Sequence, residues 1–336
     1  MDIIDDFLKR GVLVSPDVID SLKKENIDDI VSKLSSGDVV LTKTLYNYIT
    51  RGPTVKIIKE YKKDLSPKRI TYFLDFYNNR LNVLRDILKE KVEFKNTTSI
   101  NKLNYGSEAT IIGMVRDVAE NGFKMDDSTG SVFCITNESV LEDEVLGLKG
   151  KVEKSGFLVS KVYYPDISLN KKVNLTEDDV FVLFTEKLNK IPSHEYSYIF
   201  TFAINKGILR DLKTEVVTTG NNVNYPNIYT LEEPFIVDIK GVKIFTLKIN
   251  WIEDLKKKLK EDDPKKIMIQ LLRKRHFFPF EFVVGDPYLL KDVPDIVFVS
   301  GLGESFFLNY KGVSVVSVVD GKEFLVNLKD RDYKEF

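Results

Sequence analysis

Glycine and asparagine follow an apolar run in the stretch VVTTGNNVNYPNI, where Gly220-Asn221-Asn222 comes directly after a predicted buried strand. An asparagine at a strand end suits a site in which two metal ions hydrolyse a phosphodiester. Such a site also needs carboxylates and several imidazoles, because these metals bind nitrogen and oxygen donors together. The chain contains only two histidines, His194 and His276, far apart in the sequence. The histidine count therefore excludes a histidine-rich dinuclear site, wherever these residues fold.

The bulk composition predicts an ordinary globular protein of two or three domains. Of the 336 residues, 43% are hydrophobic and 30% are charged. No run of about eighteen apolar residues, the length that spans a membrane, is present. The single cysteine, Cys134, excludes an internal disulfide and a multi-thiolate zinc site, and it suits a reducing cytoplasm. The fifty basic and fifty-one acidic residues do not give the excess of positive charge that is typical of nucleic-acid-binding proteins. If the protein acts on nucleic acid, its positive charge must be local, or a partner must bind the nucleic acid.

The N-terminal part of the chain shows helical periodicity. Residues 1–60 are predicted to form a small helical domain, in which Ser15-Pro16 is typical of a helix start. Residues 61–100 are predicted to contain a connecting helix that begins at Ser66-Pro67 and has a broad apolar face. We interpret this face as packing against the next domain.

From residue 101 the apolar residues no longer follow a helical period but alternate every second residue, which is typical of strands. Residues 101–170 contain five short predicted strands, and Gly113 lies in the first of them, where a barrel must bend. This pattern predicts an OB-type β-barrel. Stacking on single-stranded nucleic acid needs exposed aromatic residues between basic ones, for which the candidates are Phe123, Lys124 and Phe133.

Residues 171–336 alternate strands with helices and predict an α/β layered domain. The segment 194–212 is expected to be mostly helical, and 234–249 to be a hairpin with Lys240-Gly241 at its tip. Two helices are expected to begin at Asn250 and Asp263, which are typical N-cap residues. The predicted fold class is therefore multidomain α+β.

Several stretches occur in an order that is typical of one family. They are ATIIGMVRDV, DDSTGSV and YYPDI in the predicted barrel, then LLRKRHFFPF, VPDIV and NYKGVSVVSV, the last ending at Val318. Together they resemble the small subunit of archaeal family D DNA polymerase, from about residue 70 to 320. The resemblance implies an OB domain joined to a calcineurin-like phosphoesterase sandwich, which in active members of the family is a 3′–5′ exonuclease.

This chain departs from the family at each phosphoesterase signature. The Asp-x-His position falls at Thr185 or Glu186, and the Gly-Asp signature is absent between Phe200 and Asp211. The His-Gly position corresponds to Ile249-Asn250, and the Gly-His-x-His position to Val299–Ser305. The resemblance therefore implies a sandwich whose metal site is degenerate, at Thr185, Glu186, Asn221, Asn222, Val223, Asn250, Leu302 and Glu304.

We therefore expect a non-catalytic accessory or scaffold subunit. The resemblance implies a heterodimer with the large catalytic subunit of family D DNA polymerase, DNA binding through that complex, and docking of other replication proteins on the N-terminal helices. We expect no cofactor, no metal, no membrane and a cytoplasmic location. The predicted partner interface comprises Trp251, because tryptophan is enriched in interface hot spots, and the basic helix end of the family-like segment, with Arg273, Arg275, His276 and Pro279.

Two other functions stay open at this point. In the first, Glu186, Asn221 and backbone donors hold one metal, and the chain is a residual metal-dependent 3′–5′ exonuclease. In the second, the chain is a stand-alone OB-fold protein that binds single-stranded DNA with salt-sensitive affinity. For the interface residues, the alternative is packing in the core and complementing a helix dipole.

Overall fold

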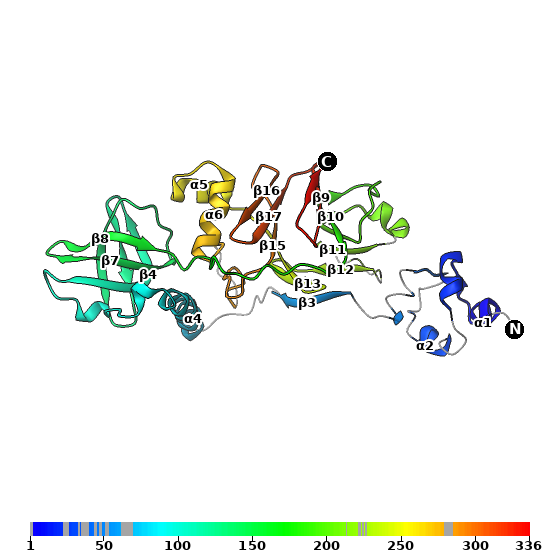
Figure 1. The fold of residues 1–336 in the computed structure, drawn as a ribbon, viewed down its shortest axis with the longest axis horizontal. Coiled ribbons are helices and arrows are strands. Elements are labelled where there is room, and N and C mark those ends of the chain that lie inside the picture. The colour runs from blue at the N-terminus through cyan, green and yellow to red at the C-terminus, as the bar shows by residue number, and fades with distance from the viewer. Residues whose placement is uncertain are drawn as a thin grey trace.

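The structure is a computed structural model, which describes the chain except for residues 1–2, 23–26, 33, 35–39, 44–45, 47–48, 51–53, 62–69, 213, 221–222, 224, 226 and 279–284. A β-barrel lies at one end, a two-sheet sandwich in the middle and short N-terminal helices at the other end (Figure 1). Among the described residues, no helix is both long and apolar enough to cross a membrane.

The N-terminal part folds around its own small apolar cluster, which includes Phe7, Val18 and Ile30. Its elements are short, namely α1 (Ile3–Lys9), β1 (Leu13–Val14), η1 (Pro16–Ser21), α2 (Ile27–Ser32) and β2 (Val40–Leu41). Ser15 precedes η1 as predicted, although its side chain makes no capping hydrogen bond to the backbone.

The connecting helix, α4 (Ile70–Lys89), packs on the outside of the barrel. Leu84 and Leu88 of this helix share a buried cluster with Met114 and Val145 of the barrel. The predicted helix start at Ser66-Pro67 lies outside the described residues. Two short turns follow, η3 (Val92–Phe94) and η4 (Ile100–Lys102).

The predicted OB-type barrel is present and closed. Its strand order is β4-β5-β6-β8-β7, with bounds β4 (Glu108–Ala119), β5 (Gly122–Asp126), β6 (Ser131–Ile135), β7 (Val145–Glu153) and β8 (Gly156–Tyr163). Gly113 of β4 lies close to β5, since a β-carbon there would come within 2.7 Å of the Asp126 carbonyl oxygen. Only glycine fits at this point of the barrel.

Two six-stranded sheets form the sandwich. The β9 sheet contains, in order, β12 (Ile228–Leu231), β11 (Glu215–Thr219), β10 (Tyr198–Ile204), β9 (Phe181–Leu188), β18 (Glu323–Asn327) and β19 (Tyr333–Glu335). The β14 sheet contains β16 (Phe306–Tyr310), β17 (Val313–Val318), β15 (Ile296–Ser300), β14 (Val242–Lys248), β13 (Phe235–Ile239) and β3 (Val55–Glu60). Val55–Glu60, although within the range assigned to the N-terminal domain, pairs with β13 as an edge strand. The predicted domain boundaries stay a prediction.

Aromatic and β-branched side chains fill the space between the two sheets. Phe184 of the β9 sheet lies 5.0 Å from Phe298 of the β14 sheet, between ring centroids. The opposite face of the β14 sheet is covered by α5 (Ile252–Leu259) and α6 (Pro264–Lys274), which bury Leu255 and Leu271. The opposite face of the β9 sheet packs against η5 (Lys206–Asp211) and neighbouring loops. An α+β fold with a layered sandwich is therefore confirmed.

Two local predictions were wrong. The segment 194–212 is not mostly helical, because Phe200 and Phe202 of β10 face the inter-sheet core while Ile199 faces the other side, as strand alternation requires. Asn250 does not cap α5: Trp251 occupies the N-cap position and Asn250 is exposed. The amide of the preceding residue, Ile249, donates a hydrogen bond to the Ser300 carbonyl. Because this bond continues the strand pairing, the helix begins after Asn250.

Two other local predictions are confirmed. Asp263 caps α6, accepting a hydrogen bond from the Lys265 amide at 2.9 Å. The β13–β14 hairpin turns at Lys240 and Gly241, both with positive φ. Positive φ at both central residues is the geometry that matches the twist of the flanking strands.

Candidate functional site

The strand ends where the resemblance implied metal ligands carry side chains with structural partners. Thr185 is buried in β9, and its hydroxyl donates to the Lys187 carbonyl at 3.4 Å. Leu302 is buried in the apolar cluster under α5 and α6. Glu304 forms an ion pair with Lys265, with 3.0 Å between Oε1 and Nζ. Each of these side chains therefore has a packing position or a partner within the chain.

The remaining predicted ligand positions add few donors. Glu186 is half-buried, Asn250 is exposed, and Val223 packs partly against the outer face of the β9 sheet. Asn221 and Asn222 lie outside the described residues. The described set offers no imidazole, so it does not fit a dinuclear site that needs several nitrogen donors. Across the described part of the chain, no group of three or more His, Cys, Asp or Glu side chains could hold a metal ion.

Both histidines have partners of their own. His276 is buried, its Nε2 lies 2.9 Å from Asp286 Oδ1, and its Nδ1 accepts a hydrogen bond from the Phe278 amide. This arrangement fixes the neutral tautomer with the proton on Nε2. His194 instead stacks on the ring of Phe336, with 3.8 Å between centroids.

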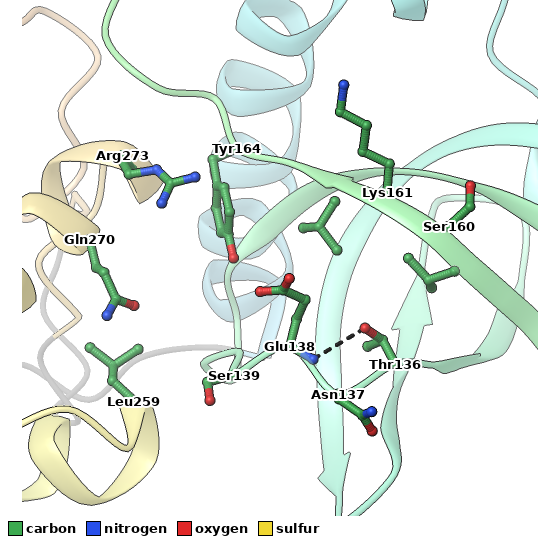
Figure 2. Close-up of a pocket in the computed structure, with 12 residues that line it drawn as sticks. Thr136, Asn137, Glu138, Ser139, Ser160, Lys161, Tyr164, Leu259, Gln270 and Arg273 are labelled. Atoms are coloured by element: carbon green, nitrogen blue, oxygen red, sulfur yellow. Dashed lines mark hydrogen bonds between the residues drawn. The ribbon is translucent and has the colours of Figure 1, made fainter.

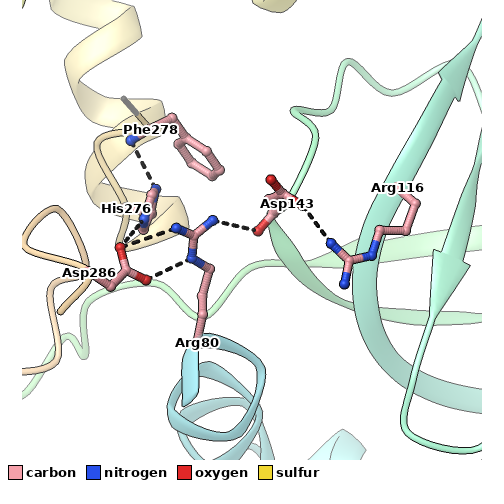
Figure 3. Close-up of polar contacts among 6 residues, drawn as sticks. All are labelled: Arg80, Arg116, Asp143, His276, Phe278 and Asp286. Atoms are coloured by element: carbon pink, nitrogen blue, oxygen red, sulfur yellow. Dashed lines mark hydrogen bonds and ion pairs between the residues drawn. The ribbon is translucent and has the colours of Figure 1, made fainter. Parts of the chain in front are cut away.

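His276 belongs to a buried polar network that joins three parts of the chain (Figure 3). Arg80 of α4 donates to both oxygens of Asp286, from Nε at 2.8 Å and from Nη2 at 3.2 Å. Its Nη1 also reaches the Asp143 carbonyl at the barrel, and Asp143 in turn accepts from Arg116 of β4 at 2.7 Å. The network therefore connects α4, the barrel and the segment after α6.

The charges of this network shift the pKa values of its members. Burial alone would raise the pKa of Asp286, but His276 and Arg80 together lower it to about 2. Burial, and then the positive charge of Arg80, lowers the pKa of His276. The stable state is therefore a carboxylate held between a guanidinium and a neutral imidazole.

A second buried contact connects the barrel with α6. Lys274 of α6 forms an ion pair with Glu144, which precedes β7, and both side chains are 1% exposed. Burial raises the pKa of Glu144, against the effect of the Lys274 charge beside it. The Lys274 ammonium also lies 4.6 Å from the ring centroid of Tyr164. Two desolvated charges at a domain junction require close geometry, which fixes the orientation of the two domains.

The segment that leaves the barrel is fixed in the same way. The Asp166 amide donates to the Arg273 carbonyl at 2.8 Å, and the Asp166 carbonyl accepts from Arg275 Nε at 2.9 Å. The Asp166 carboxylate binds Lys311 at 2.6 Å and Tyr310 at 3.0 Å. The residue therefore joins the end of α6 to the β16–β17 hairpin.

A cleft of about 610 Å³ lies between the barrel and the helices α5 and α6 (Figure 2). The barrel side contributes the loop 136–139 and part of β8, and the sandwich side contributes Leu259, Gln270 and Arg273. Arg273 stacks on Tyr164, with 4.6 Å between its guanidinium carbon and the ring centroid. The cleft is therefore a polar groove whose two walls come from different domains.

The structure gives most of the predicted interface residues roles within the chain. Trp251 is half-buried and donates from Nε1 to the Phe277 carbonyl at 3.2 Å. Arg275 ends α6 in a left-handed conformation and binds Asp166, while His276 is buried in the network. Arg273 lines the cleft, and Pro279 lies outside the described residues. Contact of these residues with a partner stays a prediction.

Five residues that join the domains are not evident from the sequence, namely Arg80, Asp143, Glu144, Asp166 and Asp286. Arg80 and Glu144 lie 206 and 130 residues from their partners, so no local pattern reveals the pairs. A weak signal existed, because Arg80 lies on α4 near Tyr77 and Leu81, on the side of the helix that becomes buried.

A closed five-stranded barrel followed by a two-sheet sandwich defines an α+β protein with an OB-type domain and a layered sandwich domain. No family model matches the chain. A solved archaeal phosphodiesterase shares 9% identity over 47% of this chain and 99% of its own, with a TM-score of 0.30, a likeness too small to support a conclusion.

Curated relatives give a clearer result. The DNA polymerase II small subunit of Archaeoglobus fulgidus is 22% identical over 93% of this chain and 89% of its own length. The protein of the same name from Pyrococcus abyssi is 35% identical over 117 residues, which are 30% of this chain and 19% of that protein. The predicted resemblance to the small subunit of an archaeal DNA polymerase is thereby confirmed.

Replacing Lys274 by methionine tests the junction ion pair. The variant K274M leaves Glu144 buried without its partner, so we expect a loss of about 3 kcal/mol in the free energy of unfolding. The double variant E144L/K274M leaves no unpaired buried charge and should be more stable than K274M. Urea unfolding of the full chain measures both. A double variant less stable than the single one would contradict the role of the pair.

Acid should weaken the His276 network. Because the pKa of His276 is lowered from 6.5 by folding, the unfolded chain takes up a proton that the folded chain does not. Its contribution to stability is therefore complete above pH 6.5 and is lost as the pH falls towards the folded pKa. The slope is at most about 1.4 kcal/mol per pH unit.

Urea unfolding at pH 7.5, 6.5 and 5.5 measures this effect. The control is H276Q, which keeps a donor but cannot titrate in this range. We expect the stability difference between the wild type and H276Q to shrink as the pH falls. A difference that is constant over this range would show that His276 does not couple folding to protons.

Proposed function

We propose that this chain is a non-catalytic accessory subunit of a DNA polymerase, which binds the large catalytic subunit and has no 3′–5′ exonuclease activity. The observation that carries the proposal is the state of the strand ends. There, Thr185, Leu302 and Glu304 serve packing and ion pairing, and no imidazole is available. DNA is bound through the complex, and the N-terminal helices dock other replication proteins.

The similarity to proteins named DNA polymerase II small subunit supports the polymerase setting. It extends over both the barrel and the sandwich, since it covers 93% of this chain. A fold retained after its ligand residues have been replaced is best explained by what its surfaces bind. The residual-exonuclease alternative would need Glu186 and Asn221 to hold a metal without an imidazole, which is a poor donor set for transition metals.

The cleft between the barrel and α5–α6 is the proposed place of contact with the large subunit. Its walls are held in register by Lys274–Glu144 and by Asp166, so the cleft keeps its shape without a partner. A preformed groove lowers the cost of binding, because little has to be ordered on association. Arg273 and Gln270 offer hydrogen-bond donors on one wall of the cleft.

An exonuclease assay tests the absence of catalysis. We expect the purified chain with manganese to shorten a 5′-labelled single-stranded oligonucleotide no faster than the same sample with chelator. An active phosphoesterase serves as the positive control. Shortening that needs manganese and that E186Q abolishes would show that the residual-exonuclease alternative is correct.

Variants in the cleft test the large-subunit contact. N137R and Q270R place long side chains on opposite walls of the cleft, while N189R makes the same kind of change at an exposed position outside it. Coexpressed with the polymerase large subunit from the same genome, the cleft variants should bind it about tenfold or more weakly, the size of an interface hot spot. N189R should bind normally. Equal binding by all three would place the interface elsewhere.

A further inference from the structure

Positive charge is concentrated on one hairpin of an otherwise acidic barrel. Residues 101–170 contain seven lysines and arginines against eleven aspartates and glutamates. Four of the seven basic residues lie on the β7–β8 hairpin, at Lys149, Lys151, Lys154 and Lys161. The near-neutral net charge of the chain therefore conceals a local basic surface.

Strand geometry places these lysines on the outside of the barrel. Leu146 and Leu148 of β7 are buried in the barrel core, so the alternate residues Lys149 and Lys151 face outward, and both are exposed. Lys161 of β8 is the cross-strand partner of Lys149, and Lys151 lies opposite Leu158. The side chain of Leu158 is 48% exposed.

This arrangement works against the stability of the barrel. Like charges directly opposite each other on antiparallel strands repel and destabilise the pair. Lys151 has an acidic partner, Glu153, at 3.0 Å. In the described part of the chain, Lys149, Lys154 and Lys161 form no ion pair within 4.0 Å. The Lys161 ammonium lies 4.7 Å from the ring centroid of Tyr163, a contact that offsets part of the repulsion. An anionic ligand bound between these lysines would neutralise the rest.

Apolar side chains continue this surface across β6 and β5. Ile135 of β6 is the strand partner of Leu158, and Phe133 is the partner of Lys124 on β5. Because Cys134 between them is buried in the barrel core, Phe133 and Ile135 face outward, and both are half-buried. Cations and apolar groups therefore alternate over neighbouring strands.

We propose that this lysine face (Lys149, Lys151, Lys154, Lys161, Leu158, Ile135 and Phe133) binds single-stranded nucleic acid. The lysines contact phosphates, and the apolar side chains contact unstacked bases, which a single strand exposes. A duplex offers mainly phosphates to such a convex surface, and its stacked bases would leave the apolar groups without partners. OB domains generally bind oligonucleotides over their second and third strands, whereas this surface is centred on the fourth and fifth.

The proposed function supplies only the setting for this contact, which is a polymerase complex on DNA. The contact itself is tested on the chain alone. Failure to bind a single strand is therefore distinguishable from failure to bind the large subunit.

Fluorescence anisotropy with a labelled oligothymidine of about 20 nucleotides, longer than the site of one OB fold, measures binding. The test variant is K149A/K161A, which removes the opposed pair. The control is K206A/K257A, which removes two exposed lysines of the sandwich that form no ion pair within the described residues. All three proteins are also unfolded in urea to compare their stability.

We expect micromolar binding by the wild type and the control, weakening as salt rises. K149A/K161A should bind about tenfold or more weakly. Its slope of log K against log salt should fall by about 1.4, since each phosphate contact on a single strand contributes about 0.7. It should be about as stable as the wild type, because the relieved repulsion between the two lysines offsets the lost contact of Lys161 with the Tyr163 ring.

Three results would overturn the proposal. The first is absence of salt-dependent binding by the wild type. The second is equal affinity and equal salt slope for K149A/K161A and K206A/K257A. The third is competition by oligoglutamate or by a duplex of the same length that is as strong as competition by oligothymidine, which would assign the face to an acidic protein segment or to duplex DNA.

Discussion

The burial of charge at the junction between the barrel and the sandwich is the constraint on which the rest of the structure depends. Lys274 and Glu144 form an ion pair shielded from water, and Arg80, Asp286 and His276 form a second buried network a short distance along the same junction. Buried charges tolerate little displacement, because each loses its hydration and is stabilised only by a partner in good geometry. The two domains are therefore held in one orientation, and the cleft between them has a fixed shape.

The structural contacts of these side chains fit the proposed absence of a phosphoesterase site. Histidines in a dinuclear site must offer a ring nitrogen to a metal, whereas both ring nitrogens of His276 are already hydrogen-bonded. Glu304, at a strand end that the resemblance assigned to ligands, balances Lys265 on α6. Side chains in these positions contact other parts of the chain, as the proposed accessory role requires.

Charged residues are used differently on two sides of the barrel, which lies at one end of the elongated molecule in Figure 1. The β7–β8 hairpin places four lysines on one side of the barrel, while Asp143 and Glu144 are used for internal pairing at the junction. Internal pairing neutralises part of the acidic excess of the barrel and leaves its exposed lysines as a local positive surface. The overall net charge of −1 therefore says little about what either surface binds.

The sequence by itself determined the features that depend on neighbouring residues. Period-two alternation fixed the barrel strands, Asp263 and Pro264 fixed the start of α6, and Lys240-Gly241 fixed a hairpin turn. The count of two histidines needed no structure at all. The tertiary structure alone decided that 198–204 is a strand, that His276 is buried, and that Arg80 binds Asp286 across 206 residues of chain. The reason is physical, because propensities and caps act within a few residues, whereas burial and ion pairing depend on which distant segments the fold brings together.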